Sequence, residues 1–382
     1  MNKKYKPVIA VAVLVILVAI LGIVTHVVMK YIPSSEKMDL NEYGSFILEE
    51  TQNLLAIDSP SGMTKKAAEH VMTRFEALGY APQTTRKDGV LVCLGGRDRE
   101  NGLLLEAHMD TLGGMVCQIK ANGRLKITPI GGLRAENVET ENCRVVTKFD
   151  GVIEGTAQLI NASTHVNEKY ADTQRTFDTV EIVLDEPVAD AEDVKKLGVR
   201  TGDYVCFEPR TRVTQSGYIK SRFLDDKLSV GILLGYAKYL KDEQITPERA
   251  VYVHVTSFEE VGHGGSASVP AGVTEAISVD MGCVGEGLTC DERMVSICAK
   301  DSGGPYHYDV VRGLIAAAEK MGAPYAVDVY PRYGSDVEAT LRAGYDIRHG
   351  LIGSGVYASH GYERSHVEGA LATLKTLIGY VG

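Results

Sequence analysis

The sequence lacks several features that would place it in familiar classes of protein. It contains no tryptophan and no Cys-x-x-Cys pair, and beyond its first residues it has no block of lysine and arginine. Its cysteines are scattered and odd in number, at positions 93, 117, 143, 206, 283, 290 and 298. This spacing argues against a disulfide framework or a structural zinc finger and favours reduced, buried thiols. The net charge of −10, without a basic cluster, argues against a nucleic-acid partner.

The remaining composition is that of a globular protein. Hydrophobic residues make up 45% of the 382 positions and charged residues 24%, which fits one large or two medium domains. The 40 glycines fit a chain with many tight turns. We find no internal repeat and no low-complexity tract.

One long apolar run lies near the N-terminus, at residues 8–29, and reads VIAVAVLVILVAILGIVTHVVM. About 20 such residues cross the hydrocarbon core of a bilayer as a helix. The run is longer than the apolar stretch of a cleavable signal peptide and lacks a small-residue exit. We therefore predict a cytoplasmic tail and transmembrane signal anchor over residues 1–30, followed by a linker over residues 31–42.

The charges beside this run indicate its orientation. Lys3, Lys4 and Lys6 precede it, so the positive-inside rule favours a cytoplasmic N-terminus. The expected location is the cell membrane, with a single span and the bulk of the chain outside the cytoplasm. A true start near Met38 would instead leave a cytoplasmic protein.

The kind of secondary structure that the sequence predicts changes twice along the rest of the chain. Residues 43–112 and 212–382 contain helix-like and strand-like segments, whereas residues 113–211 consist of short alternating pieces between Gly- and Asp-rich turns. We predict an α/β domain interrupted by a small β-barrel or sandwich at 113–211. The expected helices lie near 46–55, 71–78, 228–240, 308–321 and 366–380. The expected strands lie near 90–94, 103–105, 250–257, 276–280, 295–299 and 325–330.

Acidic and histidine residues gather where apolar runs end. Glu259 and Glu260 close one run, His108 and Asp110 close another, and Asp280 follows a third. Strand ends in α/β proteins direct their loops at a shared crevice. Carboxylate oxygens and imidazole nitrogens suit zinc, manganese or cobalt. The pattern therefore indicates a metal site at one edge of the sheet.

Each part of this pattern also has a simpler interpretation. Asp225 and Asp226 open a helix-like segment, where aspartate is a common N-cap. A lone Asp280 at a strand end is often a turn former. His360 and His366 would, as isolated histidines, more often be surface or core residues than ligands. The metal interpretation therefore depends on the order of the parts.

That order, His-x-Asp, Asp-Asp, Glu-Glu-Val-Gly, Asp and His, resembles the co-catalytic dinuclear metallo-aminopeptidases. The resemblance points to the family of glutamyl, deblocking and tetrahedral aminopeptidases, some of them labelled cellulases, and covers residues 38–382. Residues 196–203 resemble the family's return from the insert to the core. The resemblance implies a mixed-sheet, helix-flanked zinc-aminopeptidase domain over 43–112 and 212–382. It also implies that the inserted β-barrel over 113–211 makes a dimer contact.

The resemblance further implies a role for each site residue. Two divalent ions, zinc or else cobalt or manganese, would be held by His108, Asp225, Glu260, Asp280 and His360. Asp225 would bridge both ions, Glu259 would act as general base, and Asp110 would orient His108. Asp226 would follow an unusual peptide bond after the bridging aspartate.

Two further segments bear on the resemblance, one at residues 333–336 and one around His360. Tyr333-Gly334-Ser335-Asp336 resembles the family's substrate-side loop, so Ser335 and Asp336 are candidate substrate-binding residues. The chain departs from the family at the last ligand, where its residues around His360 differ from the usual run. His366 therefore stays a rival for that role.

The implied function is a metal-dependent aminopeptidase that removes N-terminal residues from peptides by a metal-activated water and a glutamate base. A deacylase acting on N-acyl amino acids would use the same site. A non-catalytic, membrane-tethered binding protein is a third hypothesis, although Glu259 and Asp225 are both present. Peptides, the membrane and further copies of the chain, as a dimer or a larger oligomer, are the expected partners.

Overall fold

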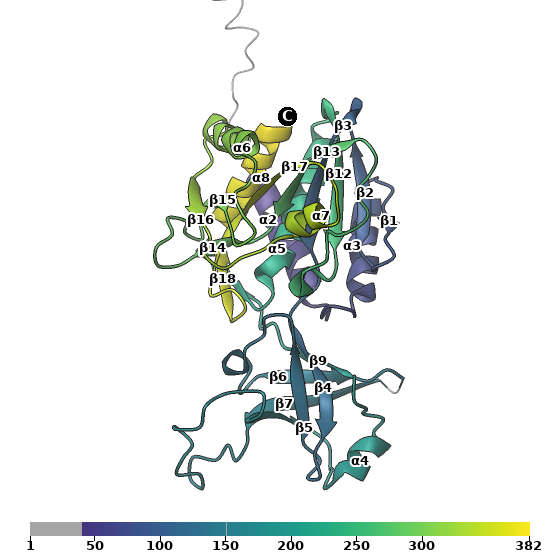
Figure 1. Ribbon diagram of the computed structural model, residues 1–382, viewed down its shortest axis with the longest axis vertical. Coiled ribbons are helices and arrows are strands. Elements are labelled where there is room, and N and C mark those ends of the chain that lie inside the picture. The colour runs from purple at the N-terminus through teal and green to yellow at the C-terminus, as the bar shows by residue number, and fades with distance from the viewer. Residues whose placement is uncertain (1–39, 150) are drawn as a thin grey trace, which may run out of the picture. The chain divides into compact units, whose positions relative to one another are not determined.

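The computed structural model describes residues 40–149 and 151–382 (Figure 1). The chain divides into two units, Met1–Glu42 and Tyr43–Gly382, and the elements discussed below lie in the second, apart from the first two residues of the first helix. The predicted anchor over residues 1–30 lies outside the described residues, as does most of the linker. Within the described residues, no helix combines the length and apolar character needed to cross a bilayer.

The α/β part is built on a twelve-stranded mixed sheet. Its order is β1-β2-β12-β3-β13-β17-β18-β11-β10, with β14 and β15 paired to β17, and β16 paired to β15. The first strands are β1 (Gln83–Thr84), β2 (Val90–Gly95), β3 (Asp98–His108), β10 (Arg212–Val213), β11 (Tyr218–Ser221) and β12 (Arg249–Thr256). The others are β13 (Val273–Val279), β14 (Gly282–Val284), β15 (Val295–Lys300), β16 (Tyr325–Val329), β17 (Arg348–Tyr357) and β18 (Glu363–His366).

The centre of this sheet is parallel. Strand β3 lies between β12 and β13 and runs parallel to both, and β17 continues the parallel set beyond β13. Parallel strands are buried on both faces, which explains their continuous apolar runs. Leu103–Leu105 are fully buried, as are six of the eight residues of β12. The sequence runs near 103–105 and 250–257 were therefore correctly predicted as strands.

Seven α-helices accompany the strands in the described part of the chain. They are α2 (Asn41–Leu55), α3 (Lys65–Ala77), α4 (Ala191–Lys196), α5 (Leu224–Asp242), α6 (Tyr308–Lys320), α7 (Asp336–Arg342) and α8 (Val367–Val381). The five predicted helices correspond to α2, α3, α5, α6 and α8. The short helices α4 and α7 were not predicted, because seven residues or fewer carry too little periodicity to detect.

Helix α5 is the central helix of the core. Its residues are buried on every side from Leu224 to Ala237, as expected for a helix that is apolar all round. It packs against α8, β3 and β17. A Cβ at Gly231 would collide with Thr51 on α2, so a glycine is needed for the two helices to approach. This packing fixes the N-terminal end of α5, where Asp225 lies.

The inserted part is a closed barrel of six strands, in the order β4-β5-β8-β7-β6-β9. Its strands are β4 (Gly113–Ile119), β5 (Leu125–Ile130), β6 (Asn142–Val146), β7 (Val152–Leu159), β8 (Val180–Leu184) and β9 (Tyr204–Phe207). Inward-facing residues such as Val116, Ile127 and Val205 are fully buried and fill it. The predicted small β-barrel is therefore confirmed, whereas its limits as a domain, 113 and 211, stay a prediction.

Polar contacts join the barrel to the α/β part. Arg144 on β6 forms a two-bond ion pair with Asp58, with nitrogen–oxygen distances of 2.7 and 2.6 Å. Asn137, in the short 3-10 turn Ala135–Asn137, donates a hydrogen bond to the backbone oxygen of His360 at 2.9 Å. The insert therefore contacts the loop that carries a predicted ligand.

Candidate metal centre

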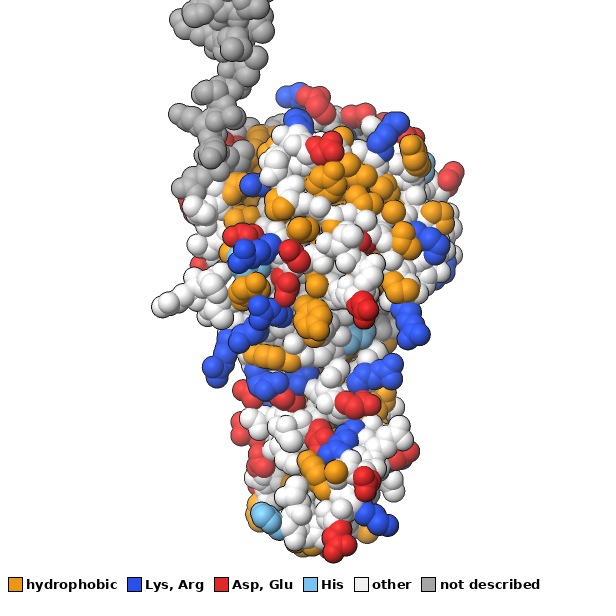
Figure 2. Space-filling view, turned by 90° about the vertical axis from the view of Figure 1, so that its left-hand side faces the viewer, with side chains coloured by type: hydrophobic (Ala, Val, Ile, Leu, Met, Phe, Trp, Pro, Cys, Tyr) orange, Lys and Arg blue, Asp and Glu red, His pale blue; other side chains and the backbone are white. Residues whose placement is uncertain are grey.

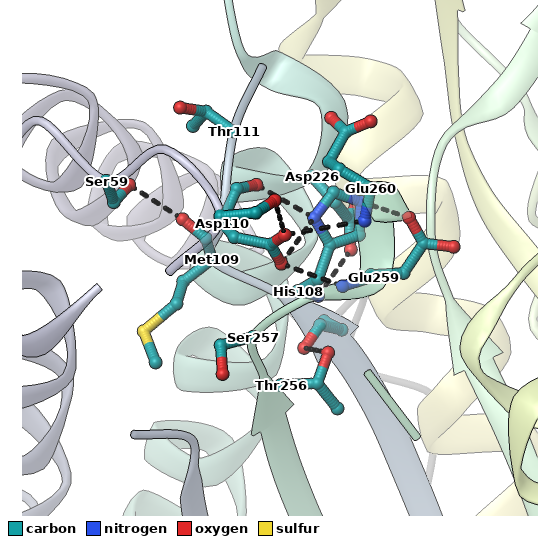
Figure 3. A network of polar contacts seen from close by, with 12 residues as sticks. Ser59, His108, Met109, Asp110, Thr111, Asp226, Thr256, Ser257, Glu259 and Glu260 are labelled. Carbon is teal, nitrogen blue, oxygen red and sulfur yellow. Dashed lines mark hydrogen bonds and ion pairs between the residues drawn. The ribbon is translucent and has the colours of Figure 1, made fainter. Parts of the chain in front are cut away.

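Three predicted site segments meet because their strands are parallel neighbours. Strand β3 ends at His108, which is in register with Thr256, the last residue of β12. Strand β13 ends at Val279, so Asp280 follows at the same edge. The carboxyl ends of parallel strands face one crevice, and loops there share a site. Figure 3 shows His108, at the end of β3, close to Glu259 and Glu260, which follow the end of β12.

The turn after β12 carries the two glutamates. Glu259–Val261 forms a single 3-10 turn, preceded by Phe258 in the left-handed conformation with φ 67°. Asp110 holds this turn in place, because its carboxylate accepts the N–H groups of Glu259 at 3.1 Å and Glu260 at 3.4 Å. The hydroxyl of Ser61 also donates to Asp110.

Asp110 also contacts His108, though differently from the sequence expectation. Nδ1 of His108 lies 3.0 Å from the backbone oxygen of Asp110 and 3.6 Å from its carboxylate. The nearest group that can orient the ring is therefore the carbonyl, and the carboxylate mainly supports the glutamate turn.

Asp225 and Asp226 reach the crevice from the start of α5. Both have non-helical backbone angles, and the peptide bond between them is cis. Oδ1 of Asp225 lies 3.0 Å from Nε2 of His108. Oδ2 of Asp226 accepts the backbone N–H of His108 at 3.2 Å. The sequence predicted Asp225 as a ligand but assigned no ligand role to Asp226.

His360 joins the cluster and His366 does not. Nε2 of His360 lies 3.6 Å from both Asp225 Oδ2 and Glu260 Oε2. His366 instead begins α8, where its Nδ1 accepts the backbone N–H of Glu368 at 3.0 Å and its Nε2 lies 2.6 Å from the backbone oxygen of Ser216. The structure thus places only His360 beside the other candidate ligands.

The candidate ligands form two overlapping groups. In each group, the ligand atoms of the three residues all lie within 4.8 Å of one another. One group is His108, Asp225 and Glu260, and the other is His108, Asp226 and Asp280. The two groups share His108, so Asp225, Asp226, Glu260 and Asp280 all lie around one imidazole ring.

The electrostatics of the cluster are those of a cation site. Burial, followed by neighbouring carboxylates, raises the pKa of Glu260 and of Asp226 well above their ordinary values. Burial raises the pKa of Asp280 to about 7. Burial lowers the pKa of His108, but Glu259 and then Asp225 outweigh it, so the pKa is raised well above its usual value. So many buried carboxylates are costly without cations.

One buried oxygen supports the same conclusion. No described residue hydrogen-bonds to Oδ1 of Asp226, although that oxygen is shielded from solvent. A buried carboxylate oxygen without a donor is costly unless an ion or water contacts it. The donor set of imidazole nitrogens and carboxylate oxygens therefore fits divalent metal ions such as zinc.

The predicted substrate residues border the same cleft with their side chains turned into the protein. The hydroxyl of Ser335 lies 3.0 Å from that of Tyr306. Asp336 accepts the hydroxyl of Thr256 and, at 2.6 Å, the N–H of Gly265. Both side chains are buried, so their contacts to the protein hold the loop in position.

The cluster lies in a cleft of about 960 Å³ between the α/β part and the barrel. Its lining includes Asp225, Glu259 and Glu260, together with exposed arginines such as Arg134 and Arg332. Figure 2 shows lysine and arginine side chains gathered around the middle of one face, between the barrel below and the α/β part above. The cleft thus combines carboxylates with guanidinium groups.

Comparison with known proteins agrees with this architecture. Residues 88–376 match the sequence profile of the family described as M42 glutamyl aminopeptidase. The chain belongs to the M42 glutamyl aminopeptidase family. The sequence resemblance to glutamyl and tetrahedral aminopeptidases is therefore confirmed, and the chain is a peptide-bond hydrolase of the aminopeptidase type.

Individual M42 relatives cover most of the chain. The protein YhfE of Bacillus subtilis (strain 168) is 41% identical over 334 residues, 87% of this chain and 96% of its own. The glutamyl aminopeptidase of Lactococcus lactis subsp. cremoris (strain MG1363) is 24% identical over 58% of this chain and 61% of its own. A solved structure of the Pyrococcus horikoshii TET1 peptidase, which can assemble into a tetrahedron or a large octahedral shell, matches with TM-score 0.77 and 22% identity. It covers 88% of this chain and 99% of its own, and shows the fold.

Proposed function

We propose that this M42 family member is a two-metal aminopeptidase in which His108, Asp225, Glu260, Asp280 and His360 hold the ions. The observation that carries the proposal is the pair of overlapping ligand groups at the base of the cleft. Asp226 is an additional candidate ligand because its Oδ1 is buried without a donor among the described residues. Zinc is the first choice for this donor set, with cobalt and manganese as alternatives.

Glu259 is the proposed general base. Its Oε2 lies 3.6 Å from Nε2 of His108, and it lines the cleft directly before the ligand Glu260. Burial raises the pKa of Glu259 well above its ordinary value, which suits a carboxyl group that accepts and returns a proton. Bound ions would supply an activated water and polarise the scissile carbonyl. Glu259 would take the proton of that water and deliver it to the leaving amine.

Asp110 and the loop of Ser335 and Asp336 would support this step. Asp110 holds the backbone of Glu259 and Glu260, so the base and the neighbouring ligand keep a fixed separation. The carbonyl of Asp110 holds the ring of His108. The loop of Ser335 and Asp336 borders the substrate side of the cleft. Substrate peptides would enter with the N-terminal residue deepest, next to the carboxylates.

The assembly and location of the protein are also proposed. Family relatives include the TET1 peptidase, which forms closed shells, and we propose that this chain forms a homo-oligomer with the barrel at the dimer contact. The apolar run at residues 8–29 supports an anchor in the cell membrane with the α/β part outside the cytoplasm.

Activity of the full-length protein in mild detergent tests the proposed reaction. The protein is stripped with a chelator, reconstituted separately with zinc, cobalt or manganese, and assayed on a panel of aminoacyl-nitroanilides and N-acyl amino acids. We expect loss of aminoacyl-nitroanilide hydrolysis on stripping, recovery with at least one metal, and two ions per chain. Fewer than one ion per chain after reconstitution, or hydrolysis of N-acyl amino acids alone, would contradict the proposal.

A further inference from the structure

Glu363, at the start of β18, connects two of the proposed ligands. Its side chain is buried, with the residue only 2% exposed. Oε2 accepts the backbone N–H of Asp225 at 3.0 Å, and Oε1 accepts the backbone N–H of His360 at 3.0 Å. One carboxylate therefore joins the start of α5 to the loop before β18, two segments 138 positions apart at the Asp225 contact.

The segment that leads into α5 needs such a partner. Phe223 occupies the N-cap position with φ 68° and offers no side-chain cap, so the first N–H groups of α5 lack the usual acceptor. The carboxylate of Glu363 supplies that acceptor from a distant strand, and the N–H of Leu224 contributes to the same contact. Glu363 thus holds the kinked, non-helical entry to α5 that carries Asp225.

The segment that carries His360 is similarly dependent on outside contacts. Ala358 and His360 both have a positive φ, 59° and 62°, in the left-handed region that non-glycine residues rarely occupy. Such conformations persist where surrounding contacts determine them. The hydrogen bond from the N–H of His360 to Glu363, together with the one from Asn137 to the oxygen of His360, provides those contacts.

We propose that Glu363 is a positioning residue that sets the separation of Asp225 and His360, and so the affinity for the ion that they share. Glu363 itself holds no ion and touches no substrate; it acts on both ligands through their backbone. The inference rests on the proposed function, because it assigns the two ligands to one ion. Residues that orient metal ligands commonly change metal affinity when they are replaced.

The chemistry of the contact requires a carboxylate. Oε2 of Glu363 accepts the N–H of Asp225 and Oε1 accepts the N–H of His360, so the contact uses two acceptor oxygens. A glutamine at this position has one acceptor oxygen and one NH₂ group, and the latter would face an N–H donor. Replacement of Glu363 by glutamine therefore keeps the size of the side chain and removes one of the two contacts.

Metal affinity of the full-length protein in mild detergent provides the test. The variants are Glu363→Gln and the matched control Glu292→Gln, whose carboxylate pairs with Arg364 next to Glu363 in sequence. Zinc affinity is measured for both sites by competition with a chromophoric chelator, and folding is checked by circular dichroism. We expect Glu363→Gln to lower the zinc affinity of one site by about 10–100-fold. The zinc affinity of the other site, and both affinities of the control variant, should not change.

A double-variant comparison separates positioning from general damage. If Glu363 acts through His360, the Glu363→Gln change should weaken zinc binding much less in a His360→Ala background than in the wild type. Equal zinc affinity in wild type and Glu363→Gln, or an undiminished effect in the His360→Ala background, would overturn the inference. If Glu363→Gln does not fold, Glu363→Asp, which keeps both acceptors but is shorter, is measured in its place with the same criteria. Absence of zinc binding by the wild type would instead refute the proposed function.

Discussion

Nε2 of His108 lies 3.0 Å from Oδ1 of Asp225, although the two residues are 117 positions apart in the chain. The contact joins the end of a central parallel strand to the start of the most buried helix. Neither element can shift without disturbing the core, so the two groups are held in place before any ion binds. Preorganised ligands of this kind favour tight metal binding.

The two C-terminal histidines should differ sharply when replaced. We expect His360→Ala to abolish activity and lower metal content, because its Nε2 lies beside Asp225 and Glu260. His366→Ala should retain bound metal and lose about 0.5–2 kcal/mol of stability, since His366 caps α8. Metal analysis, turnover and thermal unfolding of both variants check this. The opposite result would make His366 the ligand.

Glu259→Gln should separate catalysis from binding. The amide keeps the size of the side chain but cannot accept the proton of the attacking water. We expect turnover to fall by roughly 10²–10⁴, the usual contribution of a general base, with both ions and the fold retained. Steady-state kinetics and metal analysis of the variant decide the matter, and near-normal turnover would remove Glu259 from this role.

Asp110→Asn should loosen the glutamate turn. The carboxylate of Asp110 accepts N–H groups from Glu259 and Glu260 and the hydroxyl of Ser61, whereas asparagine offers a single acceptor oxygen. We expect kcat to fall by about 10–100-fold with a smaller change in KM. Ser61→Ala, which removes only one donor, is the matched control and should have a smaller effect. A normal kcat in Asp110→Asn would contradict the supporting role.

His254 should make the fold sensitive to mild acid. Burial lowers the pKa of His254 from 6.5 to about 4, so between these values the unfolded chain binds a proton that the folded chain does not. The resulting stability is complete above pH 6.5 and is lost as the pH falls towards 4, by roughly 3 kcal/mol in total.

The variant His254→Asn tests this contribution and also removes the contact of Nδ1 of His254 with Oε1 of Glu106 at 3.4 Å. The free energy of unfolding of wild type minus that of the variant should decrease by about 2–3 kcal/mol between pH 7.5 and 4.5. Denaturant titrations at both pH values measure it. A difference that does not change with pH would show that another group controls the acid sensitivity.

The N-terminal run should limit the assembly of the full-length protein. Closed shells point their subunits in all directions, and spanning helices of about 30 Å could not then enter one flat bilayer. We predict a dimer, or another assembly with all N-termini on one side, for the full chain in mild detergent. This limit would not apply to a shorter chain beginning at Met38. Sedimentation of both forms tests this, and a closed shell formed by the full-length protein would contradict the predicted span.

Much of the α/β fold could be predicted because its signals are local. The apolar runs of β2, β3, β12 and β13 fixed the strands, and the switch to short alternating segments fixed the barrel. Strands β17 and β18 were missed, as were the short strands β1, β10, β11 and β14. The buried strand β17 contains three glycines between Gly350 and Gly355, which weaken its strand pattern, and β18 has only four residues.

The amino-acid sequence by itself determined which residue types stand at the strand ends, and hence the family and the metal interpretation. Parallel strands must present their carboxyl ends at one edge, so the convergence of His108, Glu259 and Asp280 follows from the order of elements. Only the tertiary structure shows that His360 lies beside the other candidate ligands while His366 caps α8, because this depends on where a loop with positive φ turns. It also brought Glu363 to the backbone of two proposed ligands, since a hydrogen bond across 138 positions leaves no local pattern in the sequence.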